Sequence, residues 1–433
     1  MDICVVALGK IGLPLAVQFA ESGHRVRGAD VSAATVDMIN AAQVPFPGEA
    51  HLDEKLARVV AQGTLTATTD TVAAVAASQA VVIVVPLVVD DRARPDFSAM
   101  DAATEAIGRG LQPGTLVSYE TTLPVGTTRN RFTPRLAELS GLVPGEDFFV
   151  CFSPERVYSG RIFADLRRYP KIVGGIDVES TRSAVKFYDS VLQFDERSDL
   201  ARPNGVWDVG TAEAAELVKL AETTYRDVNI GLANEFAVFA RSAGVDIYAV
   251  IDAANSQPFS NIHSPGISVG GHCIPVYPRL YLSNDPGAVV PAASRVANER
   301  MPEFYAGLLA GAFDGSLAGR RVVVLGLSYR GSVKEAAFSG TFPLVDALAA
   351  LGAEVSVHDP LYSPEELTAQ GFTPATLPAD ADAAVLHTDH PEYRELRAAD
   401  LPGVTVLVDG RSSLDEQVWT ADGVRYLSIR PER

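Results

Sequence analysis

Short apolar runs alternate with helical patterns along the first third of the chain. Strand-like runs are predicted at Ile3–Leu8, Arg25–Asp30, Val81–Pro86, Thr115–Glu120, Phe148–Phe152 and Lys171–Gly175. Helical patterns lie between them, at Ile11–Ser22, Ser98–Leu111 and Thr127–Ser140. Continuous β-branched runs that alternate with helices are typical of a parallel sheet that is buried on both faces. The pattern therefore predicts an α/β domain.

A long helical pattern follows in the middle of the chain. From Thr211 to Ala243 there is no proline and only one glycine, Gly231. Apolar residues recur there in steps of three and four, at Leu217, Ala221, Tyr225, Val228, Leu232, Phe236 and Phe239, which is the period of an amphipathic helix. At about 1.5 Å per residue this helix is ~50 Å long, more than one small domain needs. We expect it to connect domains or to pack against a second copy of the chain.

The alternation of strands and helices restarts in the last third. Strands are predicted at Arg320–Leu327, Ala353–Pro360, Ala383–His390 and Val404–Gly410, with a helix near Phe342–Leu351. The expected fold is therefore α/β, with two Rossmann-like, doubly wound parallel-sheet domains joined by a long central helix and a helical segment. The predicted domains are residues 1–200, 201–310 and 311–433.

Composition and charge narrow the classes of function. The 433 residues are 47% hydrophobic and 21% charged, which is ordinary for a globular protein, and the net charge is −18. Such an acidic chain is a poor non-specific ligand for nucleic acid or anionic membranes, because both are polyanions. The beginning of the chain has neither the length nor the flanks of a signal peptide or a membrane span. We expect a cytoplasmic protein that binds neither membranes nor nucleic acid.

A glycine-containing turn follows the first predicted strand and opens a helix. The fingerprint G-x-G-x-x-G is represented there by Ala7, Gly9 and Gly12, and Asp30 ends the second predicted strand. Gly9 allows close approach of a pyrophosphate, Gly12 allows the helix to pack on the strand, and Asp30 favours NAD over NADP. The alternative is a glycine turn of some other α/β fold.

A second motif places Cys273 after a loop that contains Pro265, Gly266, Gly270 and Gly271. A cysteine at the end of such a loop and near a helix start has a stabilised thiolate. The alternative is a small buried cysteine, which is our interpretation of Cys4 and Cys151, because both lie in apolar strands. Three cysteines far apart exclude a disulfide framework and a structural zinc site, so no metal is expected.

A polar line is predicted on the long helix. Lys219, Thr223 and Arg226 are spaced by four and three residues and so share one helical face. The simple interpretation is a solvated face on which Lys219 pairs with Glu216 or Glu222. A lysine buried near a cofactor is instead a candidate proton acceptor or oxyanion stabiliser.

Together these motifs make the chain resemble the UDP-sugar 6-dehydrogenases, nearly from end to end. The resemblance is carried by "ALGKIGLPLA", "ETTLPVGTT", "SPERV", "AELVKLAETTYRDVNIGLANE", "PGISVGGHCIPVYP", "LGLSYR" and "VHDP". The motifs "SPER", "RDVNI" and "GGHCIP" are closer in sequence to the N-acetylhexosamine branch than to the animal-type glucose enzymes. The family's reaction passes two hydrides in succession from the sugar's 6-position to two NAD+, by way of an aldehyde, a cysteine thiohemiacetal and a thioester.

The resemblance implies a role for each motif residue. The expected catalytic residues are Cys273, Lys219, Thr122, Thr223 and Tyr277. Those expected to bind NAD are Gly9, Lys10, Ile11, Gly12, Asp30, Pro86 and Thr122. The nucleotide-diphosphate sugar is expected to contact Glu155, Arg156, Val157, Lys219, Asn261, Gly266, Gly270 and Arg330. A homodimer through the central helix is also expected.

The chain departs from the family pattern at several positions. Tyr277 stands in place of an aspartate that orients water, and tyrosine is a far weaker base at neutral pH. Either Tyr277 donates a hydrogen bond, or Lys219 carries more of the proton transfer, or hydrolysis is slow. The other departures are Thr223 for asparagine, Phe259 for an arginine, Ser268 for a glycine and Ala337 for an arginine.

These departures leave two other hypotheses beside the dehydrogenase. One is a non-catalytic or slowly hydrolysing homologue that binds the nucleotide sugar. The other is a β-hydroxyacid dehydrogenase, which shares the fold but needs no cysteine after a glycine loop. The dehydrogenase remains the leading hypothesis because the chain retains both the thiol and the lysine.

Overall fold

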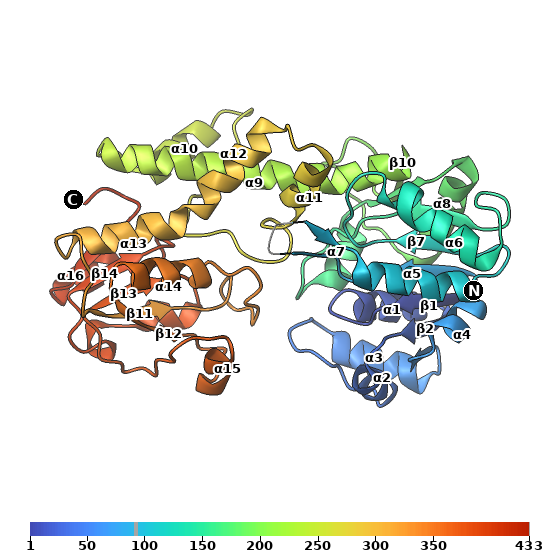
Figure 1. The fold of residues 1–433 in the computed structure, drawn as a ribbon, viewed down its shortest axis with the longest axis horizontal. Coiled ribbons are helices and arrows are strands. Elements are labelled where there is room, and N and C mark those ends of the chain that lie inside the picture. Colours follow the sequence, from blue (N-terminus) through green and yellow to red (C-terminus); the bar gives the residue numbers. More distant parts are fainter. Residues whose placement is uncertain (91–93, 433) are drawn as a thin grey trace. The chain divides into compact units, whose positions relative to one another are not determined.

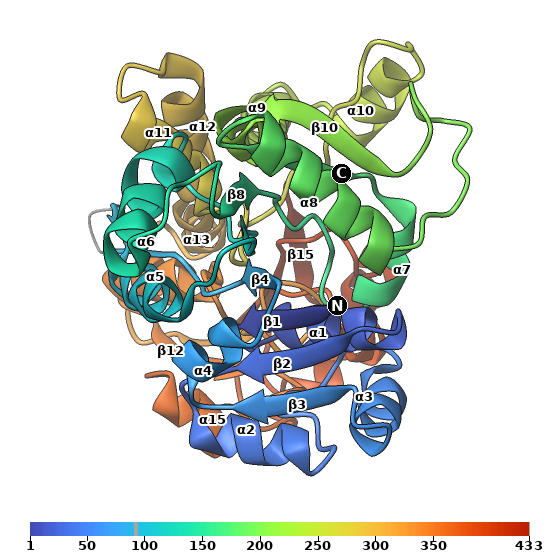
Figure 2. The same ribbon diagram turned by 90° about the vertical axis from the view of Figure 1, so that its right-hand side faces the viewer.

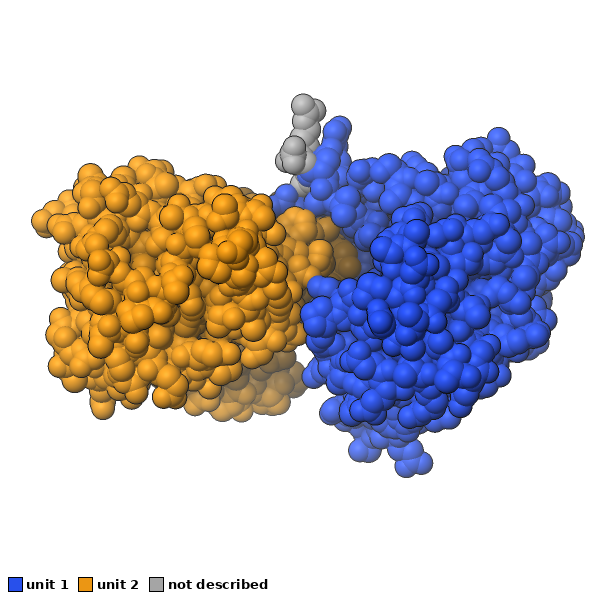
Figure 3. Space-filling view, turned by 90° about the horizontal axis from the view of Figure 1, so that it is seen from below, with its two compact units in different colours: residues 1–222, 279–284 blue, residues 223–278, 285–433 orange. Residues whose placement is uncertain are grey.

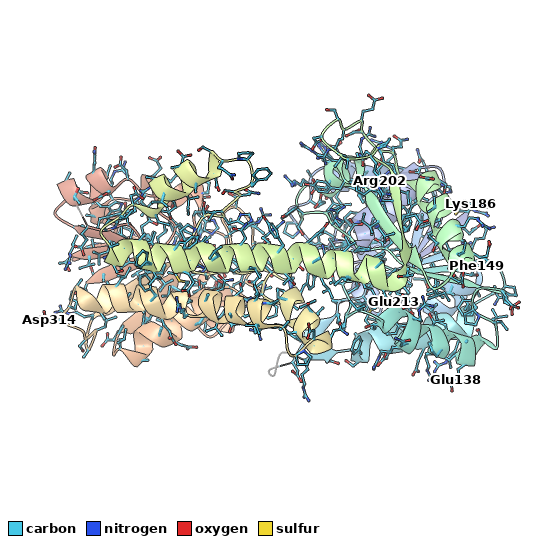
Figure 4. The ribbon with its side chains drawn as sticks, turned by 90° about the horizontal axis from the view of Figure 1, so that it is seen from above. Glu138, Phe149, Lys186, Arg202, Glu213 and Asp314 are labelled. Carbon is cyan, nitrogen blue, oxygen red and sulfur yellow. The ribbon has the colours of Figure 1, made fainter. Side chains whose placement is uncertain are left out.

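The computed structural model describes residues 1–90 and 94–432. The chain forms two compact units, which Figure 3 shows in different colours. Unit 1 holds residues 1–222 and 279–284, and unit 2 holds residues 223–278 and 285–433. Helix α9, Ala212–Ser242, is continuous from unit 1 into unit 2, with Glu213 in its first turn (Figure 4). The three-part division into 1–200, 201–310 and 311–433 stays a prediction.

Unit 1 is built on an eight-stranded sheet in the order β10-β9-β8-β7-β4-β1-β2-β3. Its strands are β1 Asp2–Val6, β2 Arg25–Ala29, β3 Leu65–Thr68, β4 Ala80–Ile83, β7 Leu116–Tyr119, β8 Phe149–Phe152, β9 Lys171–Gly175 and β10 Val206–Thr211. The strand order reverses between β1 and β4, the arrangement of a doubly wound sheet. Figure 2 shows β1, β2 and β3 side by side, as their parallel pairing requires.

One pair of strands differs from the parallel sheet that the sequence predicts. Strand β8 pairs with β9 in antiparallel fashion, through Cys151 with Gly175 and Phe152 with Gly174. The strands themselves lie where the pattern predicts them, and β9 matches its predicted bounds. An apolar β-branched run reports that a strand is buried, but it carries no information on the strand's direction.

Helices pack on both faces of this sheet and enclose the core of unit 1. They are α1 Gly12–Glu21, α2 Ala33–Asn40, α3 Leu52–Ala61, α4 Thr71–Ala76, α5 Ser98–Gly110, α6 Thr133–Ser140, α7 Ile162–Arg168 and α8 Val178–Val191. Ser32, Asp70 and Asp177 cap the first turns of α2, α4 and α8 with their side chains, which satisfies amide groups that have no partner within the helix. The short hairpin β5 Val88–Val89 and β6 Pro95–Asp96 precedes α5.

The predicted helix Thr127–Ser140 is interrupted. It begins with a π-helical turn, Thr128–Phe132, and continues as α6, which ends at Gly141 with φ +71°. The carboxylate of Glu216, on α9, accepts hydrogen bonds from the amides of Gly126 at 2.6 Å and Thr128 at 2.9 Å. Burial raises the pKa of Glu216 to about 7. Glu216 therefore fastens the start of α9 to the rest of unit 1.

Unit 2 contains a five-stranded, fully parallel sheet in the order β12-β11-β13-β14-β15. Its strands are β11 Arg321–Leu325, β12 Glu354–His358, β13 Ala383–Leu386, β14 Val406–Asp409 and β15 Arg425–Ser428. Its helices are α10 Ile247–Asn255, α12 Val289–Glu299, α13 Met301–Gly311, α14 Thr341–Ala350, α15 Pro364–Ala369 and α16 Glu416–Ala421. Helix α11, Tyr277–Asn284, is divided between the units, and only its first two residues belong to unit 2. Figure 1 shows α13 and α14 next to each other beside this sheet. The prediction of two Rossmann-like sheets with a long central helix is confirmed.

Helix α9 confirms the predicted period, but its apolar stripe faces outward. Leu217, Tyr225, Leu232, Phe236 and Phe239 are all at least 41% exposed. Apart from Leu220, the buried face of the helix carries small and polar residues: Ala215, Glu216, Lys219, Thr223, Asp227, Gly231, Ala233, Asn234, Ala237 and Ala240. A period of 3.6 residues identifies a helix with two unlike faces, but it does not tell which face is covered within one chain.

Across the described residues, we find no helix that combines the length and the apolar character needed to cross a membrane.

Candidate active site

The turn after β1 keeps the geometry of the dinucleotide fingerprint. Ala7 has φ +73° and so adopts the left-handed conformation that favours glycine. A Cβ on Gly12 would lie 1.9 Å from the Ala7 carbonyl oxygen, so only glycine lets α1 approach the turn this closely. A Cβ on Gly9 would meet nothing within 4 Å, and Gly9 is exposed. The backbone at Gly9 is therefore open to a phosphate group at the start of α1.

Asp30 ties the end of β2 to this turn. Its Oδ2 accepts a hydrogen bond from the Leu8 amide at 2.8 Å, and its Oδ1 accepts one from the Ser32 amide at 2.9 Å. These bonds hold a carboxylate beside the fingerprint turn, where it can accept hydrogen bonds from a ribose and repels a 2′-phosphate. Lys10 and Ile11 lie in the same turn, exposed and half-buried respectively.

Pro86 and Thr122 follow the two strands on the other side of the switch point. Pro86 comes after β4 and is exposed, whereas Thr122 comes after β7 and is buried. The Thr121 hydroxyl donates to the Val85 carbonyl at 2.7 Å and joins these two strand ends. Because the carboxyl ends of parallel strands share one edge of a sheet, both residues lie at the edge that carries Gly9 and Asp30. These residues fit NAD: an open turn for the pyrophosphate and a carboxylate for the ribose.

The loop after β8 is held by a buried ion cluster. Lys171 Nζ, on β9, lies 2.7 Å from Glu120 Oε2 and 3.0 Å from Glu155 Oε2. Glu120 also accepts a hydrogen bond from the Tyr188 hydroxyl at 2.6 Å. The side chains of Lys171 and Glu120 are 4% and 0% exposed. The ion pair with Lys171 therefore holds the side chain of Glu155, a predicted substrate residue, against strand β9.

The pKa values of the three charged groups in this cluster are shifted in different ways. Burial raises the pKa of Glu120 to about 7, although Lys171 opposes the shift. The pKa of Glu155 is lowered despite its burial, because Lys171 and the Arg156 amide stabilise the carboxylate. The pKa of Lys171 is raised by its two carboxylate partners, which outweigh its burial. One cation thus stabilises two buried carboxylates.

Lys219 lies against the same loop. Its Nζ donates to the carbonyl oxygen of Glu155 at 2.7 Å, and the side chain is buried. The interpretation of a solvated face is therefore wrong for Lys219 and for Thr223, which is also buried. Of the two predicted carboxylate partners, Glu216 binds the turn before α6 and Glu222 pairs with Arg156. Local spacing could not decide between the two interpretations of Lys219, because the Glu155 carbonyl that it contacts lies 64 residues away in the sequence.

The three cysteines differ in exposure, as the sequence predicts. Cys4 and Cys151 are buried in β1 and β8, and burial raises the pKa of each thiol to about 12. Cys273 is exposed and stands just before α11. Its carbonyl oxygen accepts a hydrogen bond from the Tyr277 amide at 2.9 Å, which closes the first turn. Cys273 is therefore the cysteine that a substrate can reach.

The glycines of the cysteine loop pack against the segment after β11. A Cβ on Gly270 would lie 2.6 Å from the Tyr329 Cβ, and the Gly271 amide donates to the Ala337 carbonyl at 2.9 Å. Arg330 Nε lies 3.1 Å from the Tyr329 hydroxyl. The structure thus brings two predicted substrate residues, Gly270 and Arg330, to the same tyrosine.

The start of the loop is anchored on the long helix. The Asn229 side chain donates to the Asn261 carbonyl at 2.6 Å and accepts from the His263 amide at 2.9 Å. The Gly266 amide donates to Asn234 Oδ1 at 3.0 Å. Asn261 is exposed, and so is Phe259, at 92%. Asn261 and Gly266, both predicted substrate residues, are therefore positioned by side chains of α9.

Two charged residues near the predicted site were missed in the sequence. Lys171 opens an otherwise apolar strand, and a single charge at the start of a buried strand was a usable signal. Arg411 follows the carboxyl end of β14, and its Nε donates to the His387 carbonyl at 2.6 Å. His387 Nε2 lies 2.8 Å from Ser268 Oγ, so the serine that replaces a family glycine has a buried partner. Only the folded chain shows these pairings.

Comparison with known proteins agrees with this arrangement. Models of the UDP-glucose/GDP-mannose dehydrogenase family match the chain in three parts: the NAD-binding domain at residues 1–192, the central domain at 213–295 and the UDP-binding domain at 323–416. The UDP-N-acetyl-D-mannosamine dehydrogenase of Pyrococcus horikoshii is 36% identical over 430 residues, with 96% of each chain covered. The NDP-N-acetyl-D-galactosaminuronic acid dehydrogenase of Ralstonia nicotianae is 31% identical, with 97% of this chain and 96% of the relative covered.

Solved structures show the same likeness. The UDP-D-ManNAc dehydrogenase structure from Pyrococcus horikoshii superposes with a TM-score of 0.88 at 34% identity, over 99% of both chains. A UDP-glucose dehydrogenase structure from Pyrobaculum islandicum has a TM-score of 0.84 at 28% identity and covers 100% of this chain and 98% of that one. The comparisons confirm NAD as the cofactor and do not support the non-catalytic alternative. The chain belongs to the UDP-glucose/GDP-mannose dehydrogenase family and is an NAD-dependent nucleotide-sugar dehydrogenase.

Proposed function

We propose that this enzyme oxidises the 6-hydroxymethyl group of a UDP-N-acetylhexosamine to the carboxylate, with UDP-N-acetyl-D-mannosamine as the first candidate substrate. The observation that carries the proposal is the exposure of Cys273 on an anchored glycine loop, while the other two cysteines are buried. The names of the relatives from Pyrococcus horikoshii support the choice of sugar. A cytoplasmic location follows from the need for a reduced thiol.

The residues of unit 1 serve the two oxidations. Gly9–Gly12 and Asp30 would hold NAD+, which would supply the acceptor for a hydride from carbon 6 of the sugar. Lys219 stabilises the negative charge that develops on the sugar oxygen and assists the loss of its proton. The Glu155–Val157 loop holds the sugar, and Thr122 orients water near the nicotinamide. The bond from Lys219 to the Glu155 carbonyl places the ammonium group on this loop.

Cys273 links the two oxidations. Its thiolate adds to the aldehyde carbon, and the carbonyl oxygen takes up a proton to give a thiohemiacetal. Carbon 6 of the thiohemiacetal then loses a second hydride, for which a second NAD+ would be the acceptor, and loss of the hydroxyl proton gives the thioester. Water then attacks the thioester carbon, the carbon–sulfur bond breaks, and the acid and the thiolate are released. Tyr277 donates a hydrogen bond in this step, Thr223 contributes its hydroxyl, and Asn261, Gly266, Gly270 and Arg330 contact the nucleotide-diphosphate sugar.

The proposal predicts a fixed yield of NADH. With UDP-N-acetyl-D-mannosamine in limiting amount, the enzyme is expected to form two NADH per sugar and a product that carries a carboxylate. Absorbance at 340 nm measures the yield, and mass spectrometry identifies the product. UDP-N-acetylglucosamine and UDP-glucose, tested in parallel, report the selectivity for the sugar.

Two outcomes contradict the proposal at different levels. A yield of one NADH per sugar, with an aldehyde as the final product, rules out the four-electron reaction. Two NADH per sugar from UDP-glucose, with kcat/KM above that for both N-acetylated sugars, overturns the choice of sugar but leaves the reaction type intact.

We further propose that the enzyme is a homodimer that pairs through the outer face of α9. Tyr225, Leu232, Phe236 and Phe239 form an exposed apolar stripe on this helix. Val289, Val290 and Val296 of α12 are also more than 60% exposed. Large apolar side chains that are exposed along one helix are typical of an interface rather than of a solvated face.

Charges placed in this stripe are expected to give a monomer. In the double variant Phe236→Glu and Phe239→Glu, two carboxylates would have to be desolvated on association. Light scattering coupled to size exclusion should show twice the chain mass for the wild type and a single chain mass for the variant. Val178→Glu, which changes an exposed valine on α8, is the control. A variant that keeps the wild-type mass contradicts this interface.

A further inference from the structure

Helix α12 turns polar side chains inward and apolar ones outward. Ser294, Arg295 and Asn298 are each at most 7% exposed. They face α9 at close range, because a Cβ on Gly231 of α9 would lie 2.6 Å from the Ser294 hydroxyl. Burying a charge and an amide is costly unless their hydrogen bonds are satisfied. The contacts that Arg295 and Asn298 make therefore indicate the role of this buried polar face.

Asn298 belongs to a directed series of hydrogen bonds that ends on the cysteine loop. Its Nδ2 donates to the Asp227 carboxylate at 2.8 Å, and its Oδ1 accepts from Asn234 Nδ2 at 2.9 Å. Asn234 Oδ1 then accepts from the Gly266 amide at 3.0 Å. A carboxylate can only accept hydrogen bonds, so Asp227 requires the Asn298 side chain to turn its NH2 group toward the carboxylate. The Asn298 oxygen then faces Asn234 and accepts from its NH2 group, so the Asn234 oxygen is turned toward the Gly266 amide of the loop.

Arg295 extends from the same carboxylate to the other end of the loop. Its Nε lies 3.2 Å from Asp227 Oδ2, and both side chains are buried. Its Nη1 donates to the carbonyl of Ile274 at 3.4 Å, next to Cys273. One buried aspartate thus reaches both ends of the loop, at Gly266 through two asparagines and at Ile274 through the arginine.

We propose that Asp227, Asn298, Asn234 and Arg295 are positioning residues that set the backbone of the loop from Gly266 to Ile274 and thereby the orientation of the Cys273 thiol. This role rests on the proposed function insofar as Cys273 is the nucleophile. None of the four needs to touch the substrate. A misplacement of about 1 Å in a reacting group is enough to cost ~10²-fold in rate, so a rigid grip on the loop has a large effect.

The cysteines themselves make a test that does not depend on turnover. Wild type, Arg295→Met and Asn298→Leu are treated with iodoacetamide, and alkylation of Cys4, Cys151 and Cys273 is followed by peptide mass spectrometry. Cys4 and Cys151 are buried, so their alkylation reports unfolding, whereas Cys273 reports the loop. We expect the rate at Cys273 to change about fivefold or more in both variants while Cys4 and Cys151 stay protected.

Two further variants separate positioning from general packing. Arg295→Lys keeps the charge beside Asp227 but has no guanidinium fork to reach the Ile274 carbonyl as well, so its Cys273 rate should lie between those of wild type and Arg295→Met. Arg300→Met removes the exposed pair of Arg300 with Glu235, which also joins the α12 end to α9, and should leave the rate unchanged. An unchanged Cys273 rate in Arg295→Met and Asn298→Leu overturns the proposal. So does a change that appears only together with alkylation of Cys4 and Cys151.

Kinetics give a second, independent readout. In Arg295→Met and Asn298→Leu, kcat for acid formation should fall about tenfold or more, while KM for the nucleotide sugar stays within about threefold. An equal rise in KM with kcat unchanged would instead assign the network to substrate binding and overturn its role at the thiol. If Cys273 proves dispensable for acid formation, the alkylation result still stands, so failure of the proposed function and failure of this inference can be told apart.

Discussion

Replacement of Cys273 by alanine is expected to reduce acid formation by at least about 10³-fold, because no other described cysteine is accessible to form the thioester. NADH should not exceed one equivalent per sugar, since without the sulfur the aldehyde has no covalent route to the acid. The measurement combines the final NADH yield with mass spectrometry of the product.

Cys4→Ala is the matched control for this experiment. It removes a thiol that is buried in β1, and it should keep acid formation within about twofold of wild type. Serine in place of Cys273 should also fail, because a hydroxyl at its ordinary pKa is a much weaker nucleophile than a thiolate. Acid formation at the wild-type rate in Cys273→Ala would eliminate the thioester step.

Replacement of Lys171 by methionine is expected to cost about 3–5 kcal/mol of unfolding free energy at pH 8, since it leaves two buried carboxylates without their cation. Activity should fall with it, because Glu155 and the carbonyl that binds Lys219 are no longer held. Urea denaturation measures the stability, and NADH formation measures the activity below the unfolding transition.

The loss of stability should depend on pH in one direction. Without Lys171, burial raises the pKa of Glu120 and Glu155 in the folded state above their unfolded value. A carboxyl with a raised folded-state pKa stabilises the fold at low pH, and this contribution is lost as pH rises through that pKa. The difference between variant and wild type should therefore be smaller at about pH 5 than at about pH 8.

Lys186→Met is the control for the Lys171 variant. Lys186 is an exposed residue of α8, labelled in Figure 4, on the helix that supplies Tyr188 to the cluster. Its replacement should change the unfolding free energy by less than about 0.5 kcal/mol at either pH. A Lys171→Met variant that is as stable as Lys186→Met at pH 8 would show that the cluster contributes nothing to the fold.

The features that the sequence predicts well are those written within a short stretch of chain. The turn from β1 to α1 is encoded by Gly9, Gly12 and the strand before them, and Asp30 follows one strand later. The bounds of β9 and the period of α9 follow from local apolar spacing. Cys273 was distinguished from Cys4 and Cys151 by its place after a glycine loop together with the resemblance of that loop to the family motif, whereas the other two lie in apolar strands.

Features that depend on distant partners were beyond the sequence. The direction of β9 against β8, the outward turn of the α9 stripe and the burial of Lys219 all depend on residues far along the chain. The same holds for Arg295, whose carboxylate partner lies on another helix.

What the sequence by itself determined about this protein is the order of most of its elements, the glycine turn after β1 and the difference between the loop cysteine and the two strand cysteines, because each is set by neighbours within a few residues. Tertiary structure decided which face of α9 is covered, which carboxylates surround Lys171 and what holds the cysteine loop. The physical reason is that burial and electrostatic partnership are properties of the space around a side chain, which is filled by residues from distant parts of the chain.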